Sequence, residues 1–134
     1  MVRLESDLVK VLLAACEGKL SEVSSLNWSP GSAMVVVLAS NGYPGSYEKG
    51  SVIQNLEEAE NVAETVKIFH AGTALDCDGN FVSAGGRVLG VTAKGSDLAE
   101  ARDNAYQAVE AINWPGGFYR RDIGWRALPQ QKNS

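Results

Sequence analysis

The chain has 134 residues, the length of one domain, and 45% of them are apolar, which is enough for a hydrophobic core. Its 12 basic and 16 acidic residues give a formal net charge of -4 without a basic stripe, which argues against nucleic acid as a partner. No apolar stretch has the length that spans a bilayer, and charges interrupt residues 1–7, so neither a membrane partner nor a signal peptide is expected.

The first predicted elements are a helix and a strand. Leucine and valine recur at helical spacing over residues 4–16, and Gly18 stands where such a helix would end. This helix has a broad apolar surface, which we expect to pack partly on the rest of the domain and partly on a neighbour. Residues 27–32 contain proline and glycine and predict a loop, whereas residues 34–39 are continuously apolar and predict a buried central strand.

Turn formers, short strands and one acidic helical turn are predicted in the middle of the chain. Residues 41–50 combine glycine, proline and tyrosine, which is typical of a structured surface loop, and residues 57–62 favour a brief acidic helix. Residues 76–80 have the composition of a hairpin turn. Strands are expected at residues 52–53, 66–70, 73–75, 81–84 and 88–93.

The last third of the chain predicts one helix and one extended segment. Asp97 and Glu100 have the spacing of a helix-capping box, and the apolar face that follows is rich in alanine, which suits close packing on a sheet. Residues 115–117 should end this helix, residues 118–128 should be extended, and residues 130–134 should form a flexible tail. The fold class that follows is α+β, with a mostly antiparallel sheet, an N-terminal helix and a late helix packed on it.

The only histidine and an arginine stand beside glycine pairs, and this pattern predicts a site for a small anionic ligand. Glycines let main-chain N–H groups approach a phosphate or carboxylate, and the cation supplies charge. A structural interpretation stays open, in which the histidine is only a hydrogen-bonding group, the glycine pair is a hairpin bend and the arginine is a solvated side chain. The predicted substrate-binding residues are His70, Gly72, Thr73, Gly85, Gly86 and Arg87.

Two further groups are predicted to form loops or interfaces. Gly42, Tyr43 and Pro44 suit a loop clamp or an interdomain contact. Arg120 and Arg121 could bind phosphate, pair with Asp122 or contact the carboxylates of a neighbouring domain, and we favour the interface.

No catalytic residue and no metal ligand is predicted in the chain. Glu5 and Asp7 lie close together at a helix start, where carboxylates favour the helix dipole, and this role is more common than a catalytic one. Cys16 and Cys77 have neither the spacing of zinc ligands nor the density of a disulfide scaffold, so we expect free thiols.

Five segments occur in an order that resembles the C-terminal domain of phosphoribosylamine–glycine ligase, also called glycinamide ribonucleotide synthetase, in the ATP-grasp superfamily. Each segment is a weak signal alone, but together they extend over nearly the whole chain. They are residues 3–8, 42–45, 69–73, 85–89 and 119–124.

The resemblance implies a ligase of purine synthesis that joins glycine to 5-phosphoribosylamine while ATP becomes ADP and phosphate, through an acyl phosphate of glycine. It implies ATP and magnesium as cofactors of the full enzyme, N-terminal and ATP-grasp domains as partners, and a barrel-sandwich hybrid fold with a rudimentary single hybrid motif. The expected location is the cytoplasm, or a plastid in a plant.

The ATP-grasp lysines and metal ligands of that family are missing from this chain, so we expect it to form part of an active-site wall and to be inactive and without cofactors alone. On this interpretation residues 1–134 are one C-terminal domain, and residues 1–18 link it to the absent ATP-grasp domain. The alternative is a stand-alone ligand-binding or protein-interaction domain without catalysis. A biotinyl or lipoyl carrier would need a lysine at a hairpin tip, and residues 76–80 contain none.

Overall fold

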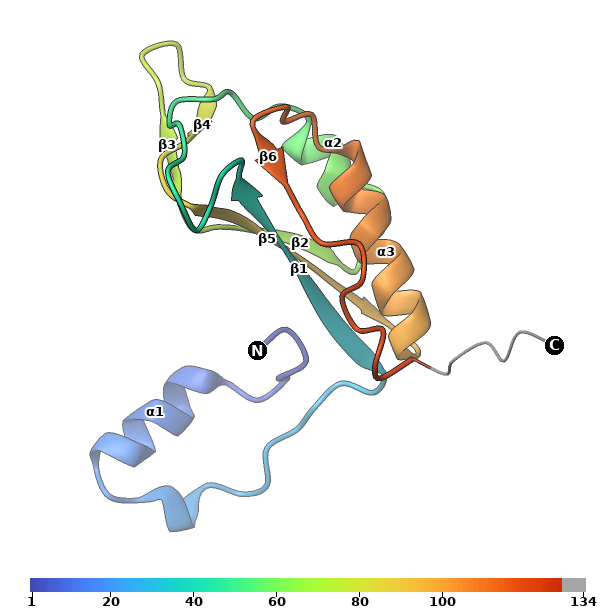
Figure 1. Ribbon diagram of the computed structural model, residues 1–134. Coiled ribbons are helices and arrows are strands. Elements are labelled where there is room, and N and C mark those ends of the chain that lie inside the picture. Colours follow the sequence, from blue (N-terminus) through green and yellow to red (C-terminus); the bar gives the residue numbers. More distant parts are fainter. Residues whose placement is uncertain (129–134) are drawn as a thin grey trace, which may run out of the picture.

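The computed structural model describes residues 1–128, in which an antiparallel sheet carries two helices on one face (Figure 1). The predicted α+β class with a mostly antiparallel sheet is confirmed. In chain order the elements are α1 (Leu8–Cys16), the short 3-10 helix η1 (Leu20–Glu22), β1 (Ser32–Ser40), α2 (Leu56–Glu60), β2 (Val66–His70), β3 (Thr73–Leu75), β4 (Phe81–Ser83), β5 (Arg87–Gly95), α3 (Leu98–Ala111) and β6 (Gly117–Phe118).

The main sheet has the strand order β2-β5-β1-β6, and every neighbouring pair is antiparallel. The two long strands β1 and β5 form its centre, with Val36 opposite Val91. The hairpin β3–β4 is a separate two-stranded sheet that projects from one end of the main sheet (Figure 1). Its turn contains the predicted residues 76–80. There the Asn80 side-chain amide and the backbone N–H groups of Asn80 and Asp78 donate hydrogen bonds to the Asp76 carboxylate, and these lower the pKa of Asp76.

The hydrophobic core lies between the sheet and α3. The helix contributes small residues, among them Ala101, Ala105 and Ala108, and these are fully buried against the sheet. The predicted cap at Asp97 is confirmed, because its carboxylate accepts a hydrogen bond from the Glu100 N–H at 2.9 Å. Glu100 does not complete the box on Asp97: it accepts a hydrogen bond from the N–H of the preceding residue, Ser96, at 2.6 Å. The hydrogen bonds from Ser96 lower the pKa of Glu100.

None of the helices in the described part of the chain packs on the opposite face of the main sheet. Along β1, Met34, Val36 and Leu38 are buried toward α3, but Val35 and Val37 are exposed on the other side. The prediction of a buried central strand is therefore correct for its central position and wrong for burial on both faces. Within residues 1–128, no second layer covers the outward side of β1.

Helices α1 and η1 form an arm that lies away from the sheet (Figure 1), whereas Met1 and Val2 line a hollow together with Val35 and Phe69 of the sheet. Asp7 caps α1, because its carboxylate accepts the Val9 N–H at 3.0 Å, and Gly18 follows the helix with φ +70° as predicted. Leu4 lies outside the helix in a bridge to Trp28. No residue of α1 is buried, so the expectation that part of its apolar surface packs on the rest of the domain is wrong.

The prediction of an extended segment at residues 118–128 is wrong beyond β6. Residues 121–128 turn back, and the Tyr106 hydroxyl of α3 holds this segment: it donates to the Arg120 carbonyl at 2.6 Å and accepts from the Ile123 N–H at 3.1 Å. Gly124, with φ +81°, provides the reversal. The predicted tail at residues 130–134 lies outside the described residues.

Within residues 1–128, no helix has the length and apolar character needed to cross a membrane. The predicted loop at residues 41–50 forms turns, and Cys16 and Cys77 are both free and exposed.

We expect Tyr106→Phe to lower the free energy of unfolding by about 1–2 kcal/mol, because the variant loses two hydrogen bonds worth about 1 kcal/mol each. Urea denaturation measures this loss, and faster amide exchange of Ile123 should accompany it. Tyr119→Phe is the matched control, since its ring lies 6.2 Å from that of Tyr106 and the variant leaves both hydrogen bonds in place. Equal stability of the two variants would contradict the role assigned to Tyr106.

Candidate functional site

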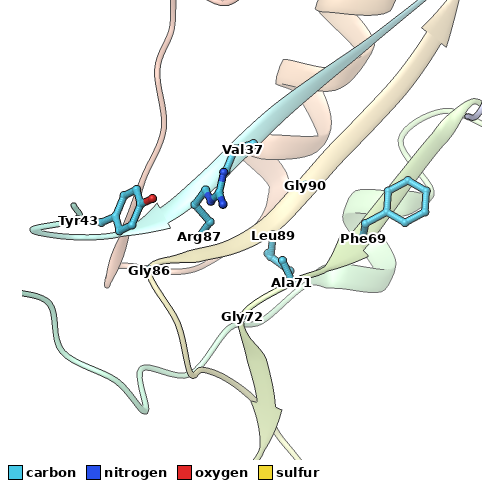
Figure 2. A pocket seen from close by; sticks show the side chains of 9 residues that line it. All are labelled: Val37, Tyr43, Phe69, Ala71, Gly72, Gly86, Arg87, Leu89 and Gly90. Atoms are coloured by element: carbon cyan, nitrogen blue, oxygen red, sulfur yellow. The ribbon is translucent and has the colours of Figure 1, made fainter.

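A shallow hollow of about 570 Å³ lies where the open face of the sheet meets the glycine bends (Figure 2). It includes Gly72, Gly86 and Arg87 of the predicted ligand site and Tyr43 of the predicted loop group. Sequence reasoning missed the other lining residues because it could not show that one face of the sheet is open. These are Val37, Phe69, Ala71, Leu89 and Gly90.

The two glycine bends of the predicted site cross each other at backbone contact. The Gly72 carbonyl accepts hydrogen bonds from the Ala84 N–H at 2.7 Å and the Gly85 N–H at 3.1 Å. A Cβ on Gly72 would lie 2.6 Å from the Arg87 carbonyl oxygen and 2.9 Å from the Gly85 Cα. Glycine is therefore needed here for the close approach of two chain segments, and this crossing fixes the start of β5 and with it Arg87.

Ser40, at the end of β1, holds the glycine pair from the other side. Its N–H donates to the Gly86 carbonyl and its hydroxyl to the Gly85 carbonyl, both at 2.8 Å, and the residue is almost completely buried. Sequence reasoning missed Ser40 because a serine after an apolar run gives no sign of its partner. The pairing of β1 with β5 supplies that partner.

Tyr43 lies against Gly86 and forms one wall of the hollow. A Cβ on Gly86 would come within 2.2 Å of Tyr43 Cδ2, so the ring occupies the space that a side chain at residue 86 would need. The ring makes an edge contact with Tyr47 at a centroid distance of 6.2 Å. Its hydroxyl is directed along the hollow toward Arg87, so a phenolic O–H and a guanidinium share one end of the site (Figure 2).

Arg87 is exposed and supplies the charge of the hollow. Among residues 1–128 it is the one charged residue in the lining, and none of their ion pairs includes it. An arginine offers a planar fork of N–H donors that matches the oxygens of a phosphate or carboxylate. The geometry therefore provides a cation and a hydroxyl on one side and an apolar floor on the other.

His70 and Thr73 do not line this hollow. His70 Nδ1 lies 3.0 Å from Thr73 Oγ1, and the histidine ring packs on Phe81 at a centroid distance of 4.5 Å. These contacts join the end of β2 to the β3–β4 hairpin. The sequence left open whether His70 binds a ligand or only holds the structure together. Its two contacts, with Thr73 and Phe81, are of the structural kind.

The predicted group at residues 120–122 lies on another part of the molecule, beside α3. Arg120 forms a two-pronged ion pair with Asp122 at 2.8 and 2.6 Å, and these hydrogen bonds lower the pKa of Asp122 and raise that of Arg120. Arg121 pairs with Glu110 at 3.1 Å. These arginines are thus paired within the domain, unlike Arg87, and both pairs are exposed, where ion pairs contribute little to stability.

Metal ligands do not gather in the described part of the chain. Residues 1–128 contain no group of three His, Cys, Asp or Glu side chains that could hold a cation.

We expect Gly86→Ala to destabilise the domain by about 1–3 kcal/mol, because the new methyl group must displace the Tyr43 ring. Gly90→Ala is the control within the same lining, since its Cβ would meet Val35 at an ordinary 3.6 Å and should cost less than about 1 kcal/mol. Thermal unfolding compares the two variants. An unchanged thermal stability of Gly86→Ala would show that the position of the Tyr43 ring does not depend on this glycine.

Comparison with known proteins gives a consistent result. Phosphoribosylamine–glycine ligase from Arabidopsis thaliana, named as chloroplastic, is 74% identical over 132 residues, which cover 98% of this chain and 25% of that protein. The ligase from Vigna unguiculata is 75% identical over 118 residues, 88% of this chain and 38% of the relative. The Escherichia coli O157:H7 ligase is 49% identical over 133 residues, 99% of this chain and 30% of the relative. The chain therefore spans well under half the length of these relatives.

A solved structure and a family model agree with these relatives. The crystal structure of phosphoribosylamine–glycine ligase from Thermotoga maritima superimposes with a TM-score of 0.68 at 37% identity and covers 86% of this chain and 27% of that one, which supports the fold that the resemblance implies. Residues 33–126 match the family model described as phosphoribosylglycinamide synthetase, C domain. The chain belongs to the phosphoribosylglycinamide synthetase C-domain family.

Proposed function

We propose that this chain is the C-terminal domain of a phosphoribosylamine–glycine ligase, which joins glycine to 5-phosphoribosylamine at the expense of ATP. The observation that carries the proposal is the hollow beside the glycine bends, with its unpaired Arg87, in a domain 74% identical to part of such a ligase. That the relatives are much longer than this chain favours a module of an enzyme over a stand-alone binding domain.

The hollow would hold the phosphate end of the sugar phosphate. Arg87 would donate from its guanidinium, and the Tyr43 hydroxyl would donate from the same end of the site (Figure 2). Gly72 and Gly86 would shape the hollow by letting the two bends cross and the Tyr43 ring lie on the main chain, because protein atoms fill the space beside each glycine. Within the predicted group, Gly85, His70 and Thr73 would act indirectly, by holding the bends and the hairpin in place.

ATP and magnesium would be held by other parts of the ligase. The described residues offer no cation cluster and no glycine-rich loop that opens into a helix around a phosphate, since Asp97 and Glu100 cap the start of α3. We assign to this domain a wall of the active site, with no catalytic residue of its own.

The N-terminal arm would join this domain to the ATP-grasp domain. Helix α1 exposes Val9, Leu12 and Leu13, and an apolar helix surface of this kind is normally covered by another part of the protein. The paired residues Arg120, Arg121 and Asp122 remain proposed as an interface group. The location would be the cytoplasm, or a plastid if the protein comes from a plant.

We expect Arg87→Ala to raise the KM for 5-phosphoribosylamine about 10- to 100-fold, because a hydrogen bond to a charged group contributes about 1.5–3 kcal/mol. Steady-state kinetics measure this change in KM in a full-length ligase. That ligase is the Arabidopsis relative in which this chain replaces the matching segment. Arg87→Lys keeps the charge and should recover part of the loss. Arg126→Ala is the control, because Arg126 is exposed and does not line the hollow. Unchanged kinetics for Arg87→Ala would overturn the role of the hollow.

We also expect no binding of ATP to the 134-residue chain alone, because no phosphate-cradling loop opens a helix within residues 1–128. Isothermal titration calorimetry with magnesium-ATP measures this. A binding isotherm that saturates would contradict the assignment of ATP to the other domains.

A further inference from the structure

The loop that carries Tyr43 begins with a pair of residues that is open to a chemical change. Asn41 and Gly42 directly follow β1, and both are exposed. They form the single Asn-Gly pair in the 134-residue sequence. Glycine has no side chain to shield its main-chain nitrogen, so this nitrogen can approach the amide carbon of the preceding asparagine. Asn41 is therefore a candidate for spontaneous deamidation.

The fold requires glycine at residue 42. Gly42 has φ +94°, in the left-handed region, and a Cβ there would clash with the carbonyl oxygen of Ser46. A larger residue that would protect the Asn41 amide from attack therefore does not fit. Among residues 1–128, the Gly42 N–H donates none of the hydrogen bonds, which leaves its nitrogen available for reaction.

Asn41 ties the loop to the segment that follows α3. Its N–H donates to the Gly116 carbonyl at 2.9 Å, and its Nδ2 donates to the Pro115 carbonyl at 3.2 Å. The side-chain hydrogen bond is exposed, and a single bond between neutral groups adds little net stability, so thermal motion breaks it often. Each time it breaks, the side-chain amide is free to turn toward the Gly42 nitrogen.

The turn at Asn41 also sets the position of the Tyr43 ring. The Tyr43 N–H donates to the Ser40 carbonyl at 3.0 Å, which closes the turn, and the ring fills the space beside Gly86. An isoaspartyl residue at position 41 would add a main-chain carbon inside this closed turn. It would also lose the amide that donates to the Pro115 carbonyl. Both changes loosen the attachment of Tyr43.

We propose that Asn41 is a site of spontaneous deamidation, and that its isoaspartyl product releases the Tyr43 ring from Gly86. The Gly42 nitrogen loses its proton to hydroxide and attacks Cγ of Asn41. An N–Cγ bond forms, the Cγ–Nδ2 bond breaks, and the amide takes a proton from water and leaves as ammonia.

Water then opens the cyclic imide at either of its carbonyls. Opening at Cγ gives aspartate, whereas opening at the main-chain carbonyl of residue 41 gives isoaspartate, in which the chain runs through Cβ. The net reaction consumes water and releases ammonia, with no oxidation or reduction. This inference does not depend on the proposed ligase activity, because it concerns the reactivity of the loop itself.

Peptide mass spectrometry of the folded 134-residue chain, incubated at neutral and alkaline pH, tests the reaction. We expect residue 41 to deamidate at least about tenfold faster than the other asparagines of residues 1–128, because each of those precedes a residue with a side chain. The rate should rise with pH, since hydroxide removes the Gly42 proton, and ammonia should appear in an equal amount. Isoaspartate methyltransferase with S-adenosylmethionine should label the product.

Asn41→Gln is the matched control for the reaction. Glutamine keeps an amide donor for the Pro115 carbonyl, but its longer side chain must close a larger and less favourable ring. We expect this variant to gain no methyltransferase label at residue 41 over the same incubation.

Amide hydrogen exchange tests the release of Tyr43. The modified chain carries an additional negative charge, so anion exchange separates it from the unmodified chain. We expect the Tyr43 N–H to exchange at least about tenfold faster in the isoaspartyl form, because its hydrogen bond to Ser40 is lost. Val91, buried at the centre of the sheet, is the internal control and should exchange equally in both forms.

Four results would overturn the proposal. Deamidation of residue 41 only after unfolding in urea would show that the folded loop is protected, and equal rates at all asparagines would remove the special role of Gly42. Unchanged exchange of Tyr43 in the isoaspartyl form would show that the ring stays in place. Faster exchange of Val91 would show a general loss of structure instead of a local release.

Discussion

Two chain segments cross at backbone contact at one end of the sheet, and the candidate site depends on this crossing. The carbonyl of Gly72 receives two N–H groups from residues 84 and 85, and Ser40 anchors the carbonyls of the same glycine pair. Side chains at these glycines would force the segments apart. The crossing therefore fixes where β5 begins, which sets the position of Arg87, and it leaves Gly86 bare so that the Tyr43 ring can lie on it.

The distribution of charge separates this site from the rest of an acidic domain. Arg120 and Arg121 have carboxylate partners beside α3, whereas Arg87 stands unpaired among the described residues, at the end of an apolar sheet face. An unpaired arginine at the edge of an apolar surface is a favourable position for an anion, because its guanidinium donors have no competing carboxylate among the described residues.

Much of the architecture could be predicted from local patterns. The helix cap at Asp97, the hairpin turn at Asp76 and the strand at residues 66–70 follow from short-range preferences that the rest of the fold does not oppose. The path of the C-terminal segment could not be predicted in this way. Tyr106, which lies 14 residues before Arg120, redirects the segment by two hydrogen bonds. Likewise, Gly72 and Gly86 could be predicted as site residues from the glycine pattern, but nothing in the local sequence of Ser40 or Val37 indicates the site that they help to form.

By itself, the sequence determined the strand and helix periods, the caps, the glycine bends and, through the order of five weak motifs, the family. These are properties of neighbouring residues, and a chain encodes them locally. The tertiary structure alone decided which face of β1 is buried, that His70 contacts the hairpin, and that Arg87 is free while Arg120 and Arg121 are paired. Such outcomes depend on which distant segments meet, because burial and ion pairing are set by contacts across space.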